Sequence, residues 1–433
     1  MPASAPITER RYLAPLSLVT TLFFLWALGV NLNDILVPHL KKVFNLTDFR
    51  SSLIQVAFFG GYCLSAIPAG RLLEKIGYHK GIVVGLVTCG IGALLFIPAA
   101  SVQIYAVFLF ALFIMACGQG VLEVAANPYV TLLGPQESSE RRLNLAQSFN
   151  SVGAVVTPYI GAAFILSTVE YSHEQLSAMP RAQLAAYRAA LANSVKGPYL
   201  VIAGTFLVFA IVFFFSRLPE ISSTRNQEPT STEFKKLLKF PHLIKGVVAQ
   251  FCYVGAQVGV GSFIIRFAQY ISPELPQASA ATYVKIHLIG FMVGRFSGSY
   301  VMKRIPAARL LSIFALCTLV CLSFVLYVGG AAALWAVALI GFFHSIMFPT
   351  IFALSIKQLG PYTKLGSSLL VASIIGGAFF PAIMGFISDH SSIRQAFFVP
   401  VVCQAYVLYF AIRGYKPTAL PLETSQLAPS ISE

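Results

Sequence analysis

The sequence predicts an all-α membrane protein in which twelve transmembrane helices form two six-helix pseudo-repeats. Of its 433 residues, 57% are hydrophobic and only 11% are charged, whereas a soluble domain has about 25% charged residues. Apolar runs long enough to form a transmembrane helix recur along the whole chain. The pattern therefore indicates a polytopic helical protein.

The apolar runs give the expected spans and the division of the chain. The twelve spans are expected at about residues 12–43, 49–74, 80–99, 104–134, 141–168, 195–217, 242–270, 278–302, 308–328, 331–358, 364–388 and 393–414. The expected order is a cytoplasmic tail (1–11), a first six-helix bundle (12–217), a cytoplasmic linker (218–240), a second bundle (241–416) and a cytoplasmic tail (417–433). The first run is too long to be the core of a signal peptide, which has about 7–15 apolar residues.

Lys and Arg residues predict the orientation, because they concentrate in the short cytoplasmic loops of membrane proteins. If both termini lie inside, the inner side receives Arg10, Arg11, Arg71, Lys75, Lys80, Arg141, Arg142, Arg217, Lys235, Lys236, Lys239, Lys303, Arg304, Arg309, Lys357, Lys364, Arg413 and Lys416. The outer side receives only Lys41, Lys42, Arg50, Arg181, Arg188, Lys196, Lys285 and Arg394. This bias explains the formal net charge of +14 without nucleic-acid binding.

Two connections are longer than the rest. In the outer connection, residues 169–194, Pro180 is followed by apolar residues on one helical face, which predicts a short surface helix. The inner connection, residues 218–240, is polar and ends in the basic amphipathic piece 234–239, which we expect to lie on the inner leaflet.

The two halves repeat short motifs at nearly the same offset, about half the chain. The pairs are Gly70-Arg71 with Gly294-Arg295, Leu133-Gly134-Pro135 with Leu359-Gly360-Pro361, and Gly153 and Pro158 with Gly376 and Pro381. A common offset is expected for two parallel repeats within one transporter.

Only two acidic side chains, Asp34 and Glu123, lie well inside a predicted span. A bare negative charge costs a few kcal/mol in lipid. Gln119, Glu123 and Asn127 follow each other at four-residue spacing, so they share one helical face. We expect this face to look into protein or a water-filled cavity. A carboxylate that neighbouring amides hold in place, with no transport role, is the alternative for both acids.

Amide and aromatic side chains inside the spans are candidate ligands for a sugar. Amides pair with hydroxyl groups, and rings cover the C–H faces of a sugar. The candidates are Asn31, Gln147, Asn150, Gln250, Gln257, Tyr253 and Phe348. For each polar candidate an ordinary interhelical hydrogen bond is the alternative, and for Phe348 a lipid-facing or core-facing ring. His287 and His344 are expected to be packed and hydrogen-bonded.

The twelve spans, the repeat and the Gly70-Arg71-Leu72 motif resemble the major facilitator superfamily. Longer motifs resemble its fucose–galactose–proton symporter family: Asn31-Leu-Asn-Asp34, Leu122-Glu123-Val-Ala-Ala-Asn127-Pro128, Asn144-Leu-Ala-Gln147-Ser-Phe-Asn150, Gln250-Phe-Cys-Tyr253-Val-Gly-Ala-Gln257 and Phe348-Pro-Thr. The resemblance covers essentially the whole chain.

This resemblance implies proton-coupled uptake of a monosaccharide, with L-fucose favoured and another hexose, such as galactose or glucose, as the alternative. It also implies that Asp34 and Glu123 handle the coupled proton. Because an apolar environment penalises the charged form, such a carboxyl group can take up and release a proton. Arg71 and Arg295, at the inner ends of their helices, are expected to act in gating.

We expect a monomer in a bacterial inner membrane that uses no cofactor besides the proton. A membrane sugar sensor and a membrane enzyme remain as remote alternatives. The sequence contains no Gly-x-x-x-x-Gly-Lys-Ser/Thr and no Gly-x-Ser-x-Gly motif, which disfavours ATP binding through a P-loop and a serine hydrolase. None of the seven cysteines forms a Cys-x-x-Cys pair, so a metal site is not expected.

Overall fold

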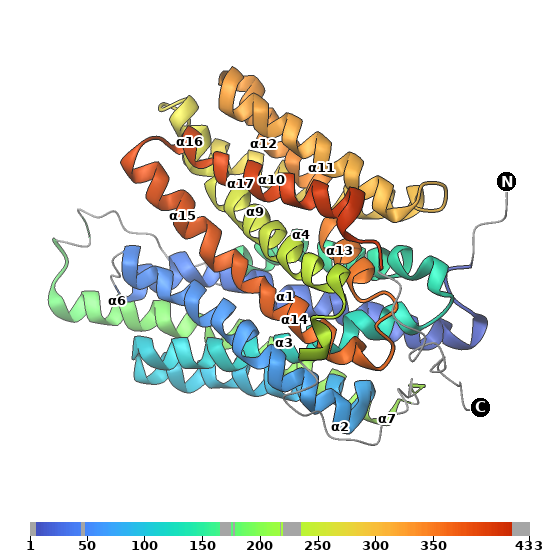
Figure 1. The fold of residues 1–433 in the computed structure, drawn as a ribbon. Helices are drawn as coiled ribbons and strands as arrows, with labels where there is room; N and C mark the ends of the chain where they lie inside the picture. Colours follow the sequence, from blue (N-terminus) through green and yellow to red (C-terminus); the bar gives the residue numbers. More distant parts are fainter. Residues whose placement is uncertain are drawn as a thin grey trace.

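The computed structural model describes residues 6–44, 48–164, 175, 178–216, 218–219 and 235–417. These residues are almost entirely helical, and the helices lie in two sets that converge at one end (Figure 1). Most of the predicted linker, residues 220–234, falls outside the described part of the chain.

The first set contains the helices before the linker. They are α1 (Leu13–Phe44), α2 (Asp48–Val102), α3 (Tyr105–Leu132), α4 (Ser139–Phe164), α6 (Arg181–Ser194) and α7 (Lys196–Phe215). The helix predicted after Pro180 is confirmed as α6, whose Leu191 is buried. The second and third predicted spans both lie within the range of α2, which consists of two helices that meet at a kink at Gly77, where the backbone is not helical (φ 78°, ψ 173°). The predicted division into two spans is therefore confirmed.

The second set contains the helices after the linker. They are α9 (Pro241–Ile271), α10 (Gln277–Val301), α11 (Ala307–Ser323), α12 (Gly330–His344), α13 (Met347–Ser355), α14 (Thr363–Ala372), α15 (Gly376–His390), α16 (Ile393–Ala396) and α17 (Phe398–Tyr409). The tenth predicted span is interrupted between α12 and α13. The eleventh is interrupted by a 3-10 turn at Ser373–Ile375.

Among the described residues, nine helices are long and apolar enough to cross a membrane. One of them, Leu53–Val102, has 50 residues and contains the kink at Gly77. The helix on each side of Gly77 has the length of about 20 residues that one crossing needs. Helices α4 and α10, with 26 and 25 residues, are also long enough but carry more polar side chains. These lengths agree with the twelve predicted spans.

Matching glycines allow two close helix crossings, one in each set. A Cβ atom at Gly153 of α4 would lie 2.7 Å from the Phe24 carbonyl oxygen of α1. A Cβ atom at Gly376, at the start of α15, would lie 2.2 Å from the Phe251 carbonyl oxygen of α9. The two glycines that the sequence repeat pairs therefore make equivalent crossings, fifth span on first and eleventh on seventh.

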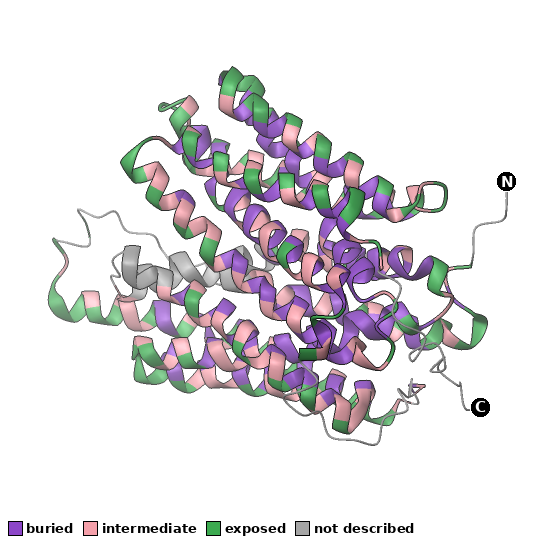
Figure 2. Cartoon of the chain, viewed as in Figure 1, coloured by how far each residue is buried: buried purple, intermediate pink, exposed green. Residues whose placement is uncertain are grey.

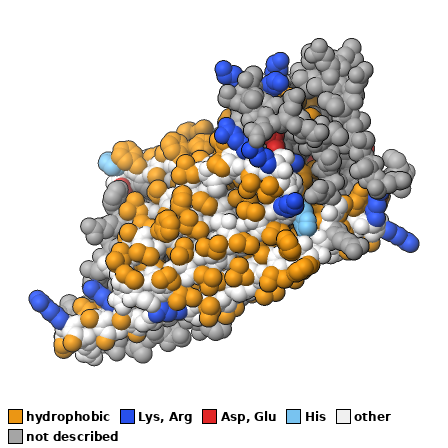
Figure 3. Space-filling model, turned by 90° about the horizontal axis from the view of Figure 1, so that it is seen from below, with side chains coloured by type: hydrophobic (Ala, Val, Ile, Leu, Met, Phe, Trp, Pro, Cys, Tyr) orange, Lys and Arg blue, Asp and Glu red, His pale blue; other side chains and the backbone are white. Residues whose placement is uncertain are grey.

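The outer surface of the helices is apolar, and the buried residues lie inside the two sets (Figure 2). Figure 3 shows a broad hydrophobic face with Lys and Arg side chains gathered toward its ends. On α7 alone, Leu200, Val201, Val208 and Phe215 are each more than half exposed. An apolar surface bordered by cations is typical of helices that contact lipid.

The start of the chain is attached to the turn between α3 and α4. The fully buried Arg142 donates from Nη1 to the Ile7 carbonyl oxygen (2.8 Å) and from Nε to the Val130 carbonyl oxygen (2.6 Å). The Thr8 hydroxyl donates to the Leu133 carbonyl oxygen (2.6 Å). Part of the predicted tail, residues 1–11, is therefore packed, because the guanidinium draws carbonyl groups from both segments.

Candidate functional site

The polar face of α3 is buried, as the sequence predicted. Gln119 and Asn127 are fully buried, and Glu123 is 5% exposed. Glu123 Oε1 accepts a hydrogen bond from Asn127 Nδ2 (3.0 Å), one turn further along the helix. The carboxyl group thus faces protein and not lipid.

Two amides connect this carboxyl group to the second set of helices. Asn127 Oδ1 accepts from Gln147 Nε2 of α4 (2.9 Å). Arg295 of α10 donates from Nη1 to both the carbonyl oxygen (2.6 Å) and Oε1 (3.3 Å) of Gln147. The result is a continuous chain of hydrogen bonds from Glu123 through Asn127 and Gln147 to Arg295.

Arg295 is itself almost completely enclosed, at 4% exposure. Its Nε donates to the Ser345 carbonyl oxygen (2.8 Å), at the interruption between α12 and α13. Its guanidinium also lies over the Phe291 ring, 4.5 Å from the centroid. The residue predicted at an inner helix end therefore lies between the two sets of helices.

Further polar contacts join the two sets at the end where they converge. Lys357 forms an ion pair with Glu140 (2.9 Å), and Asn144 Nδ2 donates to Thr350 Oγ1 (3.0 Å). The Ser299 hydroxyl donates to the Arg141 carbonyl oxygen (3.3 Å). These contacts lie in the half of the helices that carries the predicted inner loops.

A second polar group lies next to Glu123 on the side of α1 and α2. Trp26 Nε1 donates to the Tyr62 hydroxyl oxygen (3.1 Å), which in turn donates to Gln119 Oε1 (3.2 Å). Gln119 Nε2 is buried without a described partner. The Tyr62 hydroxyl group and Glu123 interact electrostatically.

In the second set, polar side chains of α9, α12 and α17 meet. The Tyr253 hydroxyl donates to the His344 carbonyl oxygen (2.8 Å), and Gln404 Nε2 lies 2.9 Å from His344 Nε2. Gln250, one turn before Tyr253, is fully buried, and neither of its polar atoms has a described partner. His344 is packed and hydrogen-bonded, as predicted.

The remaining candidates do not join the chain of hydrogen bonds. Asn31 Nδ2 donates to the Ala27 carbonyl oxygen (2.7 Å) and Asn150 Nδ2 to the Phe23 carbonyl oxygen (3.2 Å), so both bind α1 backbone. Gln257 and Phe348 are half-buried, and Arg71 is exposed. The side chain of Asp34 lies outside the described part of the chain.

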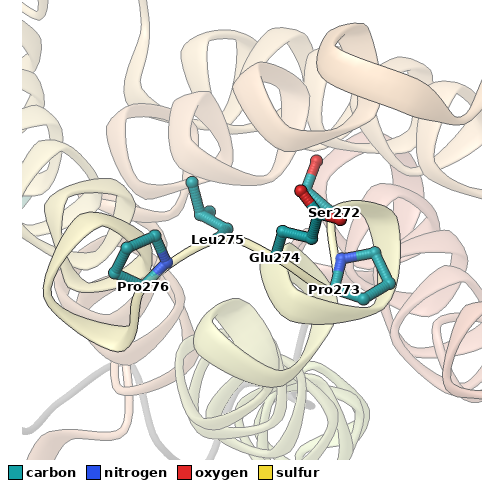
Figure 4. Close-up of a pocket in the computed structure, with 5 residues that line it drawn as sticks. All are labelled: Ser272, Pro273, Glu274, Leu275 and Pro276. Atoms are coloured by element: carbon teal, nitrogen blue, oxygen red, sulfur yellow. The ribbon is translucent and has the colours of Figure 1, made fainter.

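The chain of hydrogen bonds contains one residue that was not among the predicted site residues, Asn127. Its position four residues after Glu123 was the available signal. In the described residues no cluster of acidic, histidine and cysteine side chains could hold a metal ion. A pocket of about 500 Å³ lies beside the short connection between α9 and α10 formed by Ser272, Pro273, Glu274, Leu275 and Pro276 (Figure 4).

Comparison with known proteins gives consistent matches over nearly the whole chain. Residues 19–370 match the sequence profile of the Major Facilitator Superfamily. The chain is 41% identical over 409 residues to the L-fucose-proton symporter of Escherichia coli (strain K12), covering 93% of each protein. It is 42% identical over 412 residues to the glucose/galactose transporter of Brucella abortus (strain 2308), covering 94% of this chain and 96% of that protein.

Solved structures give the same result. The crystal structure of a Major Facilitator Superfamily transporter, FucP, in the outward conformation matches with a TM-score of 0.88 at 41% identity, over 94% of this chain and all of that one. The proton:xylose symporter XylE, at 14% identity over 93% of this chain and 96% of that one, matches with a TM-score of 0.70 and shows the shared fold.

Proposed function

The chain belongs to the major facilitator superfamily, and from this premise we propose that it is a secondary transporter that takes up a monosaccharide together with protons. The two bundles rock about a site near the middle of the membrane and expose it to either side in turn. The observation that carries the proposal is the buried Glu123, connected by hydrogen bonds to the opposite set of helices.

A carboxyl group in this position suits proton coupling. An apolar surrounding favours its neutral form, whereas the Asn127 amide favours the charged form. A change of conformation that alters either influence therefore makes the group bind or release a proton. We propose the same role for Asp34 on α1, which the matching motif supports.

The sugar is proposed to bind between the two sets of helices. Asn31, Gln147, Asn150, Gln250, Gln257 and Tyr253 are the proposed hydroxyl ligands, and Phe348 the proposed stacking ring. Both polar ends of the Gln147 amide are occupied here. Sugar binding at Gln147 would therefore compete with the connection between Glu123 and Arg295.

We propose that the structure represents an outward-facing state in a bacterial inner membrane, with both termini cytoplasmic and one chain as the working unit. The contacts of Asn144, Ser299 and Lys357 with the opposite set lie toward the predicted inner side. Arg71 and Arg295 are proposed to act in the inner gate. The FucP structure that matches this fold was solved in the outward conformation.

L-fucose is the proposed sugar, and galactose or glucose is the second candidate. The motif Gln147-Ser-Phe-Asn150 favours the first, whereas the 42% identity to a glucose/galactose transporter favours the second. One reoriented amide changes which hydroxyl group is recognised, so the two candidates differ by a few side chains.

The test is uptake of labelled sugars into vesicles that contain the purified protein. L-fucose, D-galactose and D-glucose are compared, each with and without an inward proton gradient. We expect accumulation of one of these sugars, strongest for L-fucose, only when the gradient is present. Equal uptake with and without the gradient would contradict proton coupling, and conversion of the sugar would indicate an enzyme.

A further inference from the structure

The hydrogen bonds between Glu123 and Arg295 have a direction that their two ends impose. An ionised carboxylate only accepts hydrogen bonds, and a guanidinium only donates them. Each amide between them must therefore turn its NH2 group toward Glu123 and its oxygen toward Arg295. The observed order, with Asn127 Nδ2 on Glu123 and Gln147 Nε2 on Asn127, is the one that these ends require.

Protonation of Glu123 removes the reason for this order. A neutral carboxyl group can donate to Asn127, which is favourable if the Asn127 oxygen turns toward it. The Asn127 NH2 group then faces Gln147, whose oxygen turns to accept. This leaves the Gln147 NH2 group facing the Arg295 guanidinium, two donors without an acceptor between them.

We propose that Asn127 and Gln147 form an amide relay that transmits the protonation state of Glu123 to Arg295 in the opposite set of helices. Asn127 is a positioning residue in this relay. The charged carboxylate keeps the Gln147 side-chain oxygen on Arg295, in addition to the Gln147 main-chain carbonyl oxygen that Arg295 also binds, and so strengthens the closure of the inner side. The proton removes the side-chain bond and thereby favours opening of the inner side. The inference rests on the proposed function and adds a mechanism of coupling to it.

The proposed effect of protonation, which is to favour opening toward the inside, agrees with the requirements of symport. The loaded, protonated carrier opens toward the inside. After the sugar and the proton leave, the carboxylate regains its donors and the inner side closes again. All four side chains are 5% exposed or less, so solvent does not replace these hydrogen bonds.

Other charged groups around Glu123 do not provide the same connection. In the described part of the chain, the groups that interact electrostatically with its carboxyl are Arg295 of α10 and Tyr62 of α2. Tyr62 belongs to the first set and is bonded to Trp26 and Gln119 of that set. Arg142 of α4 binds backbone carbonyls near the end of α3, beginning at Val130.

The test measures the distance between the two sets at the inner end as a function of pH. Spin labels are placed at Gln136, before α4, and at Arg304, after α10, which are both exposed. In the otherwise unchanged protein, lowering the pH should shift the distance distribution toward longer distances. Asn127→Leu, of similar size but unable to donate or accept, should lose this pH-dependent shift.

Asn144→Leu is the matched control, because Asn144 is also a fully buried asparagine and contacts Thr350 of the other set without touching the relay. It should move the distribution at every pH but keep its pH dependence. Asn127→Ser, which is smaller and polar, replaces Asn127→Leu if that variant does not fold. A pH response in the Asn127 variant equal to that of the control would overturn the relay.

The experiment distinguishes failure of the amide relay from failure of the proposed transport function. Sugar uptake by the unchanged protein is measured in the same vesicles, with and without a proton gradient. Proton-driven uptake together with an unaltered pH response in the Asn127 variant rejects the relay alone. Absence of proton-driven uptake in the unchanged protein rejects the proposed function.

Discussion

Glu123 is the residue on which the proposed coupling depends. Among the described residues its carboxyl group has one direct hydrogen-bond donor, Asn127, and is connected to the Arg295 guanidinium through a second amide, Gln147. A direct ion pair with Arg295 would hold the carboxylate in its charged form through the whole cycle. The indirect connection leaves the group able to change its protonation state.

Glu123→Gln tests this role, because glutamine keeps the size and one acceptor oxygen but cannot ionise. We expect exchange of sugar between equal concentrations on both sides to persist within a few-fold of the unchanged protein. Accumulation driven by a proton gradient should be lost. The measurement is uptake of labelled sugar into vesicles, in both the exchange and the gradient format.

Glu274→Gln is the matched control, since it makes the same chemical change at an exposed carboxyl group in the connection between α9 and α10. It should leave both exchange and accumulation unchanged. Full accumulation by the Glu123 variant would remove this residue from proton coupling.

At this scale the sequence predicted the acid but not its partners. A charge within an apolar run is visible in the sequence, because burying it is costly. The contact between Gln147 and Arg295 joins residues 148 positions apart, and no local pattern encodes which faces of two distant helices meet. The sequence also gave no means to see that both ends of the Gln147 amide are occupied in this state.

Among the helices, close crossings at glycine residues help to hold each set together. Gly153 brings α4 onto α1, and Gly376 brings the start of α15 onto α9. In a membrane, where apolar side chains gain little by leaving lipid, close packing of this kind drives helix association. The repeated positions make the first and second sets similar in how their helices cross.

Gly153→Val should destabilise the crossing of α4 with α1. The added Cβ atom would lie within 2.7 Å of the Ala27 Cβ atom and the Phe24 carbonyl oxygen, so the helices must move apart. Overpacking of this kind costs about 1–3 kcal/mol. The midpoint of thermal unfolding of the purified protein should fall accordingly.

Gly204→Val on α7 is the comparison, because a Cβ atom there has nothing within 4 Å. It should leave the midpoint unchanged or raise it, since glycine is a weak helix former. If both variants unfold at the same temperature, the crossing at Gly153 does not limit stability.

The sequence predicted helix positions well where length and hydropathy set them. The seventh span, expected at 242–270, is α9 at Pro241–Ile271. The interruption at Ser373–Ile375 was not placed, because apolar residues continue through it. The kink at Gly77 lies where the connection between the second and third spans was predicted, and its positive φ of 78° is a conformation that glycine adopts readily.

For the whole molecule, the distribution of contacts between the two sets decides which side is open. The ion pair of Lys357 with Glu140 is one of the contacts between the two sets at the proposed inner side. The Glu140 side chain is 8% exposed and that of Lys357 31%, so water weakens the pair. Such a pair contributes up to about 1 kcal/mol.

Glu140→Gln and Lys357→Gln should each shift the balance between outward-facing and inward-facing molecules toward the inward-facing form. A loss of about 1 kcal/mol corresponds to roughly a fivefold change in that ratio. The measurement is the distance distribution between labels at Gln136 and Arg304 at fixed pH. Because both substitutions remove the same interaction, the double variant should shift the ratio no more than either single one.

An additive effect of the two substitutions would mean that the pair does not act as a unit.

For the whole molecule, the sequence predicted the number of spans and the relation of the two halves. It did not predict the conformation, because one sequence must adopt both the outward-facing and the inward-facing arrangement.

The attachment of Ile7 and Thr8 to the turn between α3 and α4 matters for anyone who shortens or tags this protein. A chain that lacks residues 1–8 would leave the buried Arg142 guanidinium without the Ile7 carbonyl oxygen as an acceptor, in a place that water does not reach. Poor yield of such a chain would then be mistaken for a defect in sugar handling. Purification tags belong ahead of residue 6 or at the opposite terminus.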